Sequence, residues 1–252
     1  PMSDVIKFED GGYRFVPSVF QYSAGVAAEA GNRIVRITFR KPVPVAAGFQ
    51  QIKAHLEAEG LPLTRFCACE LRSPGQFTDA GFKAFNELYV ETLKAWGIMR
   101  DDHINPVARS NVCPEVTPPP EPSFHAFAYV TANDGAHPPT ALTSGGAEAR
   151  EGAGPYADRI VRYGDTGPDA LREKALFVVD EMQRRLSLLG FSWAETTAVQ
   201  AYSVFDFHHV MAAMAERGVL EKGLTWHYAR PPVVGLDYEM DARVASDERI
   251  IA

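Results

Sequence analysis

The stretch GPDALREKALFVVDEMQRRLSLLG (residues 167–190) carries the clearest structural pattern in the chain. Its apolar residues recur at spacings of three and four, which is typical of a helix with one buried face. These residues are Leu171, Ala175, Val178, Val179, Met182, Leu186 and Leu189. Pro168 suits the first turn of a helix, and Gly190 suits its C-terminal cap. The sequence therefore predicts an amphipathic helix over this stretch.

Strand patterns and a second helical pattern surround this helix. Runs rich in β-branched and aromatic residues predict strands, and a capped apolar repeat predicts the helix. The expected strands are 123–132, 140–149 (which ends in a tight glycine turn), 195–207 and 230–244, and the expected second helix is 206–218. The second half of the chain thus has the order β-β-α-β-α-β.

The first half of the chain shows a similar order. Its expected strands are 14–28, 32–43, 64–73 and 106–116, and its expected helices are 46–60 and 78–97. Gly60 and Gly190, which end corresponding helices, are 130 residues apart, and Arg109 and Arg230 are 121 apart. Such a period indicates two similar units. We predict an α/β (α+β) chain of two units, residues 1–120 and 121–252, with the proline-rich EVTPPPEP (115–122) as a stiff link.

Composition excludes several kinds of partner. The net charge is −7 and no run of basic residues occurs, so the sequence predicts no binding to nucleic acid. No stretch reaches the roughly 18 apolar residues of a membrane span. The opening PMSDVIKFEDGG is polar and acidic, unlike a signal peptide. We therefore expect a cytoplasmic protein.

Cysteine and histidine do not form a metal-binding pattern. The chain has three cysteines, too few for a disulfide framework. Cys67 and Cys69 lie in TRFCACEL, where strand alternation places both on one face, and we favour packing over a metal or redox role. His208 and His209 are adjacent, so they point in different directions from a helix. We predict neither a metal nor a cofactor.

Several short motifs resemble those of the Rid (YjgF-type) imine and enamine deaminases. They are TSGG (143–146), LGFSWAETTAVQAYSVFDF (189–207), YARP (228–231) and EMDA (239–242), with weaker matches in YSAGV (22–26) and ARSNV (108–112). The resemblance implies chorismate-mutase-like repeats, each a sheet with helices on one face. It also implies a homotrimer, here a pseudo-hexamer of repeats, with sites between neighbouring units.

The same resemblance assigns roles to particular residues. Arg230 becomes the carboxylate clamp and Glu239 the acid that handles water. The substrate-binding residues that it implies, or that lie near this motif, are Arg109, Tyr22, Ser144, Gly145 and His227. Gly146 departs from the family pattern, which has glutamine there, and the segment PSFHAF (122–127), which corresponds in the first half to the strand of Glu239, has no carboxylate. The two halves are therefore not expected to build equal sites.

The residue types suit the hydrolysis of an enamine or imine that carries a carboxylate. The arginine fork binds a carboxylate through two hydrogen bonds, and a buried carboxyl group can transfer protons to and from water. Structural interpretations stay open: Arg230 and Glu239 could form an ion pair, Tyr22 could pack in a strand, and Ser144 could form a turn. We predict a cofactor-independent deaminase, with an aminomuconate-type intermediate of aromatic catabolism as one candidate substrate. The alternatives are a chorismatase-like hydrolase and a non-catalytic carboxylate-binding protein.

Overall fold

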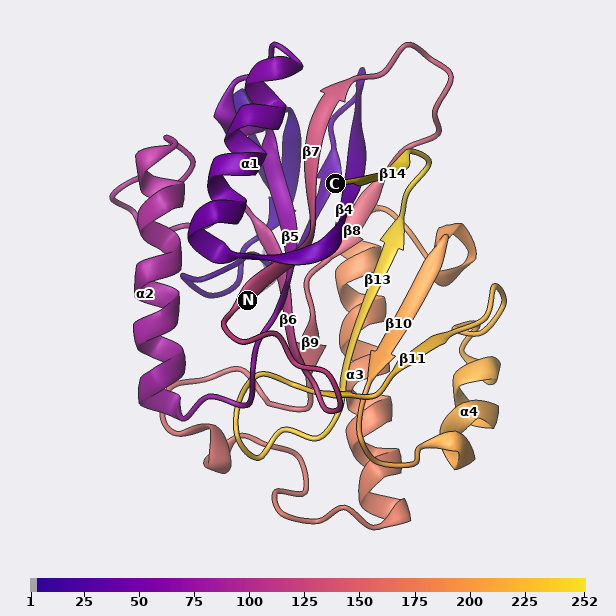
Figure 1. Cartoon of the computed structure of the whole chain (residues 1–252). Helices are drawn as coiled ribbons and strands as arrows, with labels where there is room; N and C mark the ends of the chain where they lie inside the picture. Colours follow the sequence, from indigo (N-terminus) through magenta and orange to yellow (C-terminus); the bar gives the residue numbers. More distant parts are fainter. Residues whose placement is uncertain (1–3) are drawn as a thin grey trace.

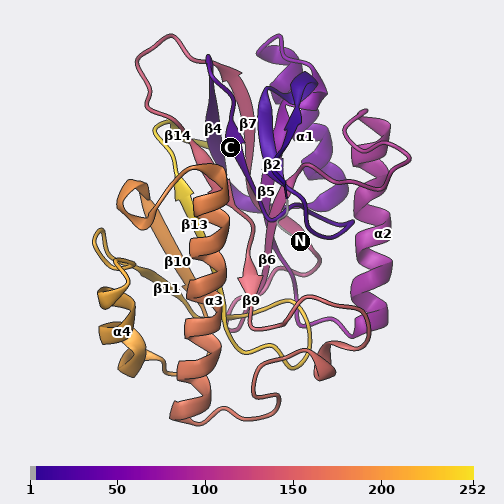
Figure 2. The same cartoon turned by 180° about the vertical axis from the view of Figure 1, so that it is seen from behind.

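The computed structural model describes residues 4–252, and residues 1–3, which begin the stretch judged unlike a signal peptide, lie outside it. The described residues form two β-sheets and four α-helices, so the mixed α/β prediction is confirmed. The helices are α1 (Val45–Ala58), α2 (Asp79–Ala95), α3 (Pro168–Leu189) and α4 (Met211–Glu216). Figures 1 and 2 show α1 and α2 on one side of the strands and α3 and α4 on the other.

The first sheet combines strands from both ends of the chain. In spatial order its strands are β1 (Ile6–Phe8), β2 (Tyr13–Val16), β3 (Gly25–Ala28), β8 (Ala141–Thr143), β13 (Glu239–Val244), β10 (Ala198–Tyr202) and β11 (Thr225–His227), with β9 (Gly146–Ala147) paired to β13. Early strands therefore extend the sheet of the second half, because β3 pairs with β8.

The second sheet is also built from distant segments. Its spatial order is β12 (Ala229–Arg230), β6 (Ala108–Pro114), β5 (Phe66–Arg72), β7 (Ser123–Ala132), β4 (Asn32–Pro44) and β14 (Glu248–Ile251). β12 and β14 come from the C-terminal part of the chain. β7 begins after residue 120 and pairs with both β4 and β5, so the sheets do not divide at residue 120.

Four strands of each sheet share one connectivity. The second sheet follows β4–α1–β5–α2–β6–β7 along the chain, with the spatial order β4-β7-β5-β6. The first sheet follows β8–α3–β10–α4–β11–β13, with the spatial order β8-β13-β10-β11. In each sheet the last of these strands along the chain, β7 or β13, lies antiparallel between two neighbours. The two strands at one end of the four, β5 and β6 or β10 and β11, pair in parallel.

The predicted helix over 167–190 is confirmed, whereas the predicted strand over 230–244 is wrong. Pro168 occupies the first turn of α3, and Gly190 caps it with φ of 93°. The segment 230–244 divides into β12 and β13, which belong to different sheets. Pro231 and Pro232 cannot donate ladder hydrogen bonds, and Gly235 adopts a φ of 94°. The chain between β12 and β13 therefore turns. The predicted helix over 206–218 is likewise reduced to a 3₁₀ turn and the short α4.

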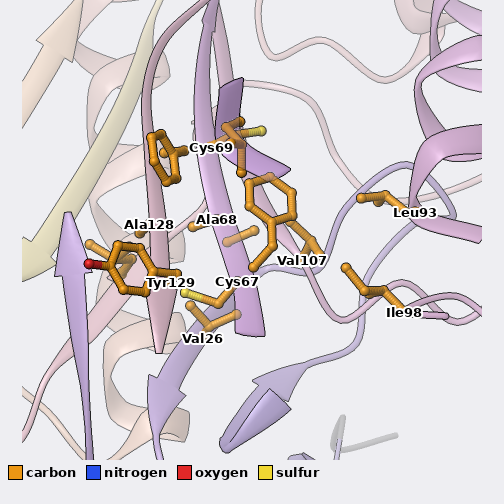
Figure 3. Packing of buried hydrophobic residues seen from close by; sticks show 14 of the residues in the cluster. Val26, Cys67, Ala68, Cys69, Leu93, Ile98, Val107, Ala128 and Tyr129 are labelled. Atoms are coloured by element: carbon orange, nitrogen blue, oxygen red, sulfur yellow. The ribbon is translucent and has the colours of Figure 1, made fainter. Parts of the chain in front are cut away.

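Two large apolar clusters form the core. One packs α1 and α2 against the second sheet and includes side chains from β1, β2, β3 and β8 of the first, and another joins α3 and α4 to the first sheet. Cys67 and Cys69 belong to the first of these clusters, and Figure 3 shows both among its buried side chains. They are free and buried, which confirms the packing interpretation.

Two further observations concern residues 4–252 only. None of the helices there has the length and apolar character needed to cross a bilayer. No three His, Cys, Asp or Glu side chains in this range are grouped as metal ligands.

Candidate active site

Arg109 lies on β6 with its side chain buried against α2. Only 2% of the residue is exposed, and Nη2 donates a hydrogen bond of 2.7 Å to Oδ1 of Asn86. Aromatic rings surround the guanidinium group, with its central carbon 4.7–5.8 Å from their centroids; they belong to Tyr22, Phe82, Phe85 and Tyr89. The cation is therefore held in an aromatic cage with one amide partner.

Two nitrogens of this guanidinium group, Nε and Nη1 of Arg109, are buried without a hydrogen-bond partner. A buried cation with unpaired donors is unfavourable unless an anion completes it. A carboxylate is suited to this task, because its two oxygens can accept from neighbouring guanidinium N–H groups. The unpaired donors of Arg109 have the chemistry to bind a carboxylate.

Glu239, at the start of β13, is the buried acid of the same region. The residue is 4% exposed, and its Oε2 has no hydrogen-bond partner. Burial, followed by the charges of Asp241 and Glu148, raises the pKa of Glu239 well above its ordinary value, against smaller lowering effects from Arg72 and Arg185. Burial thus favours the protonated form of the Glu239 carboxyl group over its carboxylate.

The loop between β8 and β9 connects Arg109 with Glu239. The backbone N–H of Arg109 donates to Oγ of Ser144 over 3.0 Å, and the N–H of Gly145 donates to the carbonyl of Arg109 over 3.2 Å. A Cβ atom on Gly145 would lie 2.6 Å from Oε2 of Glu239. Only glycine therefore allows this carboxyl group to approach the loop so closely.

Tyr22 completes the group on the side of the first half. It directly precedes Ser23, whose carbonyl accepts a hydrogen bond from the Ser144 hydroxyl. Burial and then Tyr156 raise the pKa of Tyr22, while Arg109 lowers it and Glu239 raises it. The charges of both Arg109 and Glu239 therefore act on the phenol of Tyr22. The predicted residues Arg109, Tyr22, Ser144, Gly145 and Glu239 come together in one place.

Arg230 does not join this group. It lies on β12 and donates hydrogen bonds of 2.9 and 3.2 Å to Glu115, and both side chains are 36% exposed. The expected pairing of Arg230 with Glu239 is therefore corrected: the turn after Pro231 and Pro232 separates β12 from β13, and Arg230 forms its ion pair at the surface.

His227 belongs to a neighbouring polar network between the sheets. Its Nε2 lies 2.8 Å from Oε1 of Gln200, and its ring stacks on Tyr202. Burial and the charge of Arg72 lower the pKa of His227 to about 4. The centre of this network is Asp241, which accepts hydrogen bonds of 2.8 Å each from Ser110, Gln200 and Tyr202. A cavity of about 20 Å³ beside Asp241 has room for one water molecule.

Sequence reasoning missed two residues of the site. Asn86 interrupts the aromatic face of the helix predicted over 78–97, and a polar residue at such a position is a usable signal. Arg185 on α3 donates to the carbonyls of Ser144 and Gly145 over 3.1 and 3.4 Å and to Glu181 over 3.0 Å. No sequence signal distinguishes Arg185 from the exposed Arg184 beside it.

The family of the chain follows from comparison with known proteins. A family model described as "2-aminomuconate deaminase CnbZ" matches residues 5–249. The chain belongs to the 2-aminomuconate deaminase family. A 2-amino-5-chloromuconate deaminase of Comamonas testosteroni is 50% identical over 252 residues, which cover 99% of this chain and 100% of that protein. The assignment to the Rid family is thereby corrected.

Family membership confirms the predicted class of chemistry. The protein is a deaminase, a hydrolytic enzyme that acts on a C–N bond. Among solved structures, a chorismatase aligns with a TM-score of 0.49 and 13% identity, over 91% of this chain and 79% of that one. A cyanuric acid hydrolase from A. caulinodans aligns with a TM-score of 0.41 and 11% identity, over 86% and 68% of the two chains. These two likenesses are too low to indicate a substrate.

Proposed function

We propose that this protein hydrolyses a 2-aminomuconate-type enamine to the corresponding 2-oxo acid and ammonia, with Arg109 and Glu239 as its principal site residues. The observation that carries the proposal is the buried guanidinium group with unpaired donors, linked through Gly145 to a buried carboxyl group whose pKa is raised. A 2-aminomuconate carries an amino group on a conjugated diene with a carboxylate at each end. Both its charge and its flat shape match this site.

Arg109 binds one substrate carboxylate in this proposal. The aromatic cage excludes water from the guanidinium group, which strengthens its attraction for an anion. Asn86 holds Nη2, so the orientation of the fork is set before the ligand arrives. The rings that surround the cation also suit a planar conjugated chain.

Glu239 moves the protons. In its protonated form the carboxyl group donates a proton to the carbon next to the amino-bearing carbon of the diene, which converts the enamine to an iminium ion. The resulting carboxylate takes a proton from water as that water adds to the iminium carbon. Glu239 then protonates the amino nitrogen, ammonia leaves as the C–N bond breaks, and the carboxylate takes the remaining hydroxyl proton as the carbonyl forms. The net change is enamine plus water to ketone plus ammonia, and Glu239 ends as it began.

Tyr22, Ser144 and Gly145 line the site in this proposal. Gly145 leaves the space into which Glu239 projects, and Ser144 fastens the loop to both neighbouring segments. The carboxylate clamp proposed here is Arg109, because Arg230 is already paired with Glu115. His227 and the cavity beside Asp241 lie next to the site and suit a role in holding water.

We also infer that the two halves are chorismate-mutase-like repeats of one ancestral unit. The shared order of helices and strands in the two sheets supports this. The homotrimer stays a prediction. Because Arg109 comes from the first half and Glu239 from the second, a single chain supplies both principal residues of the proposed site.

The test is ammonia release from freshly prepared 2-aminomuconate by wild-type protein, Glu239→Gln and Arg230→Gln. We expect turnover by wild type, a loss of about 10²- to 10⁴-fold in kcat for Glu239→Gln, and near wild-type rates for Arg230→Gln. Absence of turnover by the folded wild-type protein would overturn the proposed substrate. Full activity of Glu239→Gln would remove Glu239 from the reaction.

A further inference from the structure

Lys174, Glu148 and Asp237 form a cluster of charges in the interior, outside the contacts of the proposed site. The side chains of Lys174 and Glu148 are 0% exposed. Nζ of Lys174 donates a hydrogen bond of 2.7 Å to Oδ2 of Asp237 and lies 3.6 Å from Oε1 of Glu148. The cluster therefore ties α3 to the segments that flank β9 and β13.

This cluster holds the chain immediately before Glu239. The Glu148 carboxylate accepts hydrogen bonds from the backbone N–H groups of Asp237 and Tyr238, the latter over 3.0 Å. On the other side, Ala147 is the strand partner of Glu239 itself. Residues 237–239 are thus fastened to residues 147–148 by both a side chain and the strand ladder.

Stability alone does not account for such an arrangement. Burying three charged groups carries a large desolvation cost, and apolar residues of similar volume often stabilise a protein as well or better. The charged groups instead fix the position of the backbone at residues 237–238 and exert an electrostatic field on Glu239. Both effects act directly on Glu239, since the hydrogen bonds of Glu148 end one residue before it.

We propose that Lys174, Glu148 and Asp237 are positioning residues that hold the Glu239 carboxyl group against Gly145 and toward the bound substrate. This inference rests on the proposed function. The residues touch the reacting atoms only through Glu239. Disturbing them changes the chemical step more than substrate binding, because Arg109 lies on β6 and the cage residues Phe82, Phe85 and Tyr89 lie on α2.

The cluster also carries an electrostatic signature. The titratable and charged groups that act on or respond to Glu239 are Asp241 on the same strand, Glu148 after β9, Arg72 on β5, Cys113 on β6, Arg185 on α3 and Tyr22 before β3. Burial raises the pKa of Glu148 to about 7. When Glu148 is ionised, its charge raises the pKa of Glu239. A neutral side chain at position 148 therefore lowers the pKa of Glu239, which deprotonates at a lower pH.

The experiment compares steady-state kinetics and pH profiles of wild type, Lys174→Met and Glu148→Gln on 2-aminomuconate. We expect kcat to fall about 10- to 100-fold in both variants, as for a misplaced catalytic group, with KM within about threefold of wild type. In Glu148→Gln the alkaline limb of the kcat profile should move to lower pH. The matched control is Arg33→Gln, which breaks the partly buried ion pair with Asp247 far from the site and should leave kcat unchanged.

Four outcomes would overturn the inference. One is a variant that loses thermal stability but keeps its kcat and its pH profile, which would make the cluster structural. Another is a rise in KM with unchanged kcat. If Lys174→Met does not fold, Asp237→Asn, which preserves the shape of the side chain, decides between these results. Inactive wild type would remove the proposed function together with this inference, whereas active wild type with unaffected variants would remove this inference alone.

Discussion

The backbone N–H of Gly145 donates to the carbonyl oxygen of Arg109 over 3.2 Å, and this bond joins the two halves of the chain at the proposed site. Gly145 follows β8 in one sheet, and Arg109 lies on β6 in the other. Gly145 therefore holds the backbone of Arg109 and the carboxyl group of Glu239 in fixed positions relative to each other.

Arg109→Lys should lower kcat/KM about 100-fold, since a lysine keeps the charge but loses the planar fork. The loss should appear mainly in KM, because substrate anchoring is the role proposed for this residue. Steady-state measurements on 2-aminomuconate check this. Arg230→Lys is the matched control, because an exposed ion pair contributes only about 0–1 kcal/mol. Equal effects of the two substitutions would contradict the assignment of the clamp.

Gly145→Ala should reduce kcat at least about tenfold while the protein stays folded, because the added Cβ would displace the Glu239 carboxyl group. Gly75→Ala offers a control in the same protein, since no atom lies within 4 Å of a Cβ at that position. Activity assays and far-UV circular dichroism of both variants supply the comparison. Unchanged activity of Gly145→Ala would show that Glu239 does not need its present position.

The free energy of unfolding should decrease below neutral pH, in part because His227 is buried in the folded protein. Burial lowers the pKa of His227 to about 4, so between the ordinary value and about 4 the unfolded chain binds a proton that the folded chain does not. The free energy of unfolding therefore decreases as the pH falls through this window. His227→Gln should make that decrease smaller, as measured by urea unfolding at pH 7.5 and pH 5. The same pH dependence in wild type and variant, with His209→Gln as an exposed control, would refute this role.

The cysteines should be inert in the native protein. Burial raises the pKa values of Cys69 and Cys113 to about 12, and Cys67 is equally enclosed, so thiolate is scarce at neutral pH. We expect Ellman's reagent to label none of the thiols in the folded state and three after unfolding in guanidinium chloride. Rapid labelling of folded protein would instead indicate that one of these thiols is accessible.

Ser144, Gly145 and Glu239 were selected from the sequence because the motifs TSGG and EMDA resemble those of the Rid deaminases. The structure brings these three residues together, although the chain belongs to another family. The sequence could not decide whether Arg109 or Arg230 is the buried arginine. Both follow alanine ahead of a strand, and they differ only in what surrounds them after folding: an aromatic cage for one and Glu115 at the surface for the other.

Local sequence alone determined the helix from Pro168 to Leu189, the burial of Cys67 and Cys69, and the mixed α/β class, because periodicity and capping act between near neighbours in the chain. Tertiary structure alone decided which strands share a sheet, as when β3 joins β8 and β12 leaves β13 for β6. It also decided which buried charges find partners, as Lys174 does with Asp237 and Arg109 does not. These strand pairings join residues more than one hundred positions apart, and Lys174 lies 63 positions from Asp237. No local pattern encodes contacts between residues so far apart in the chain.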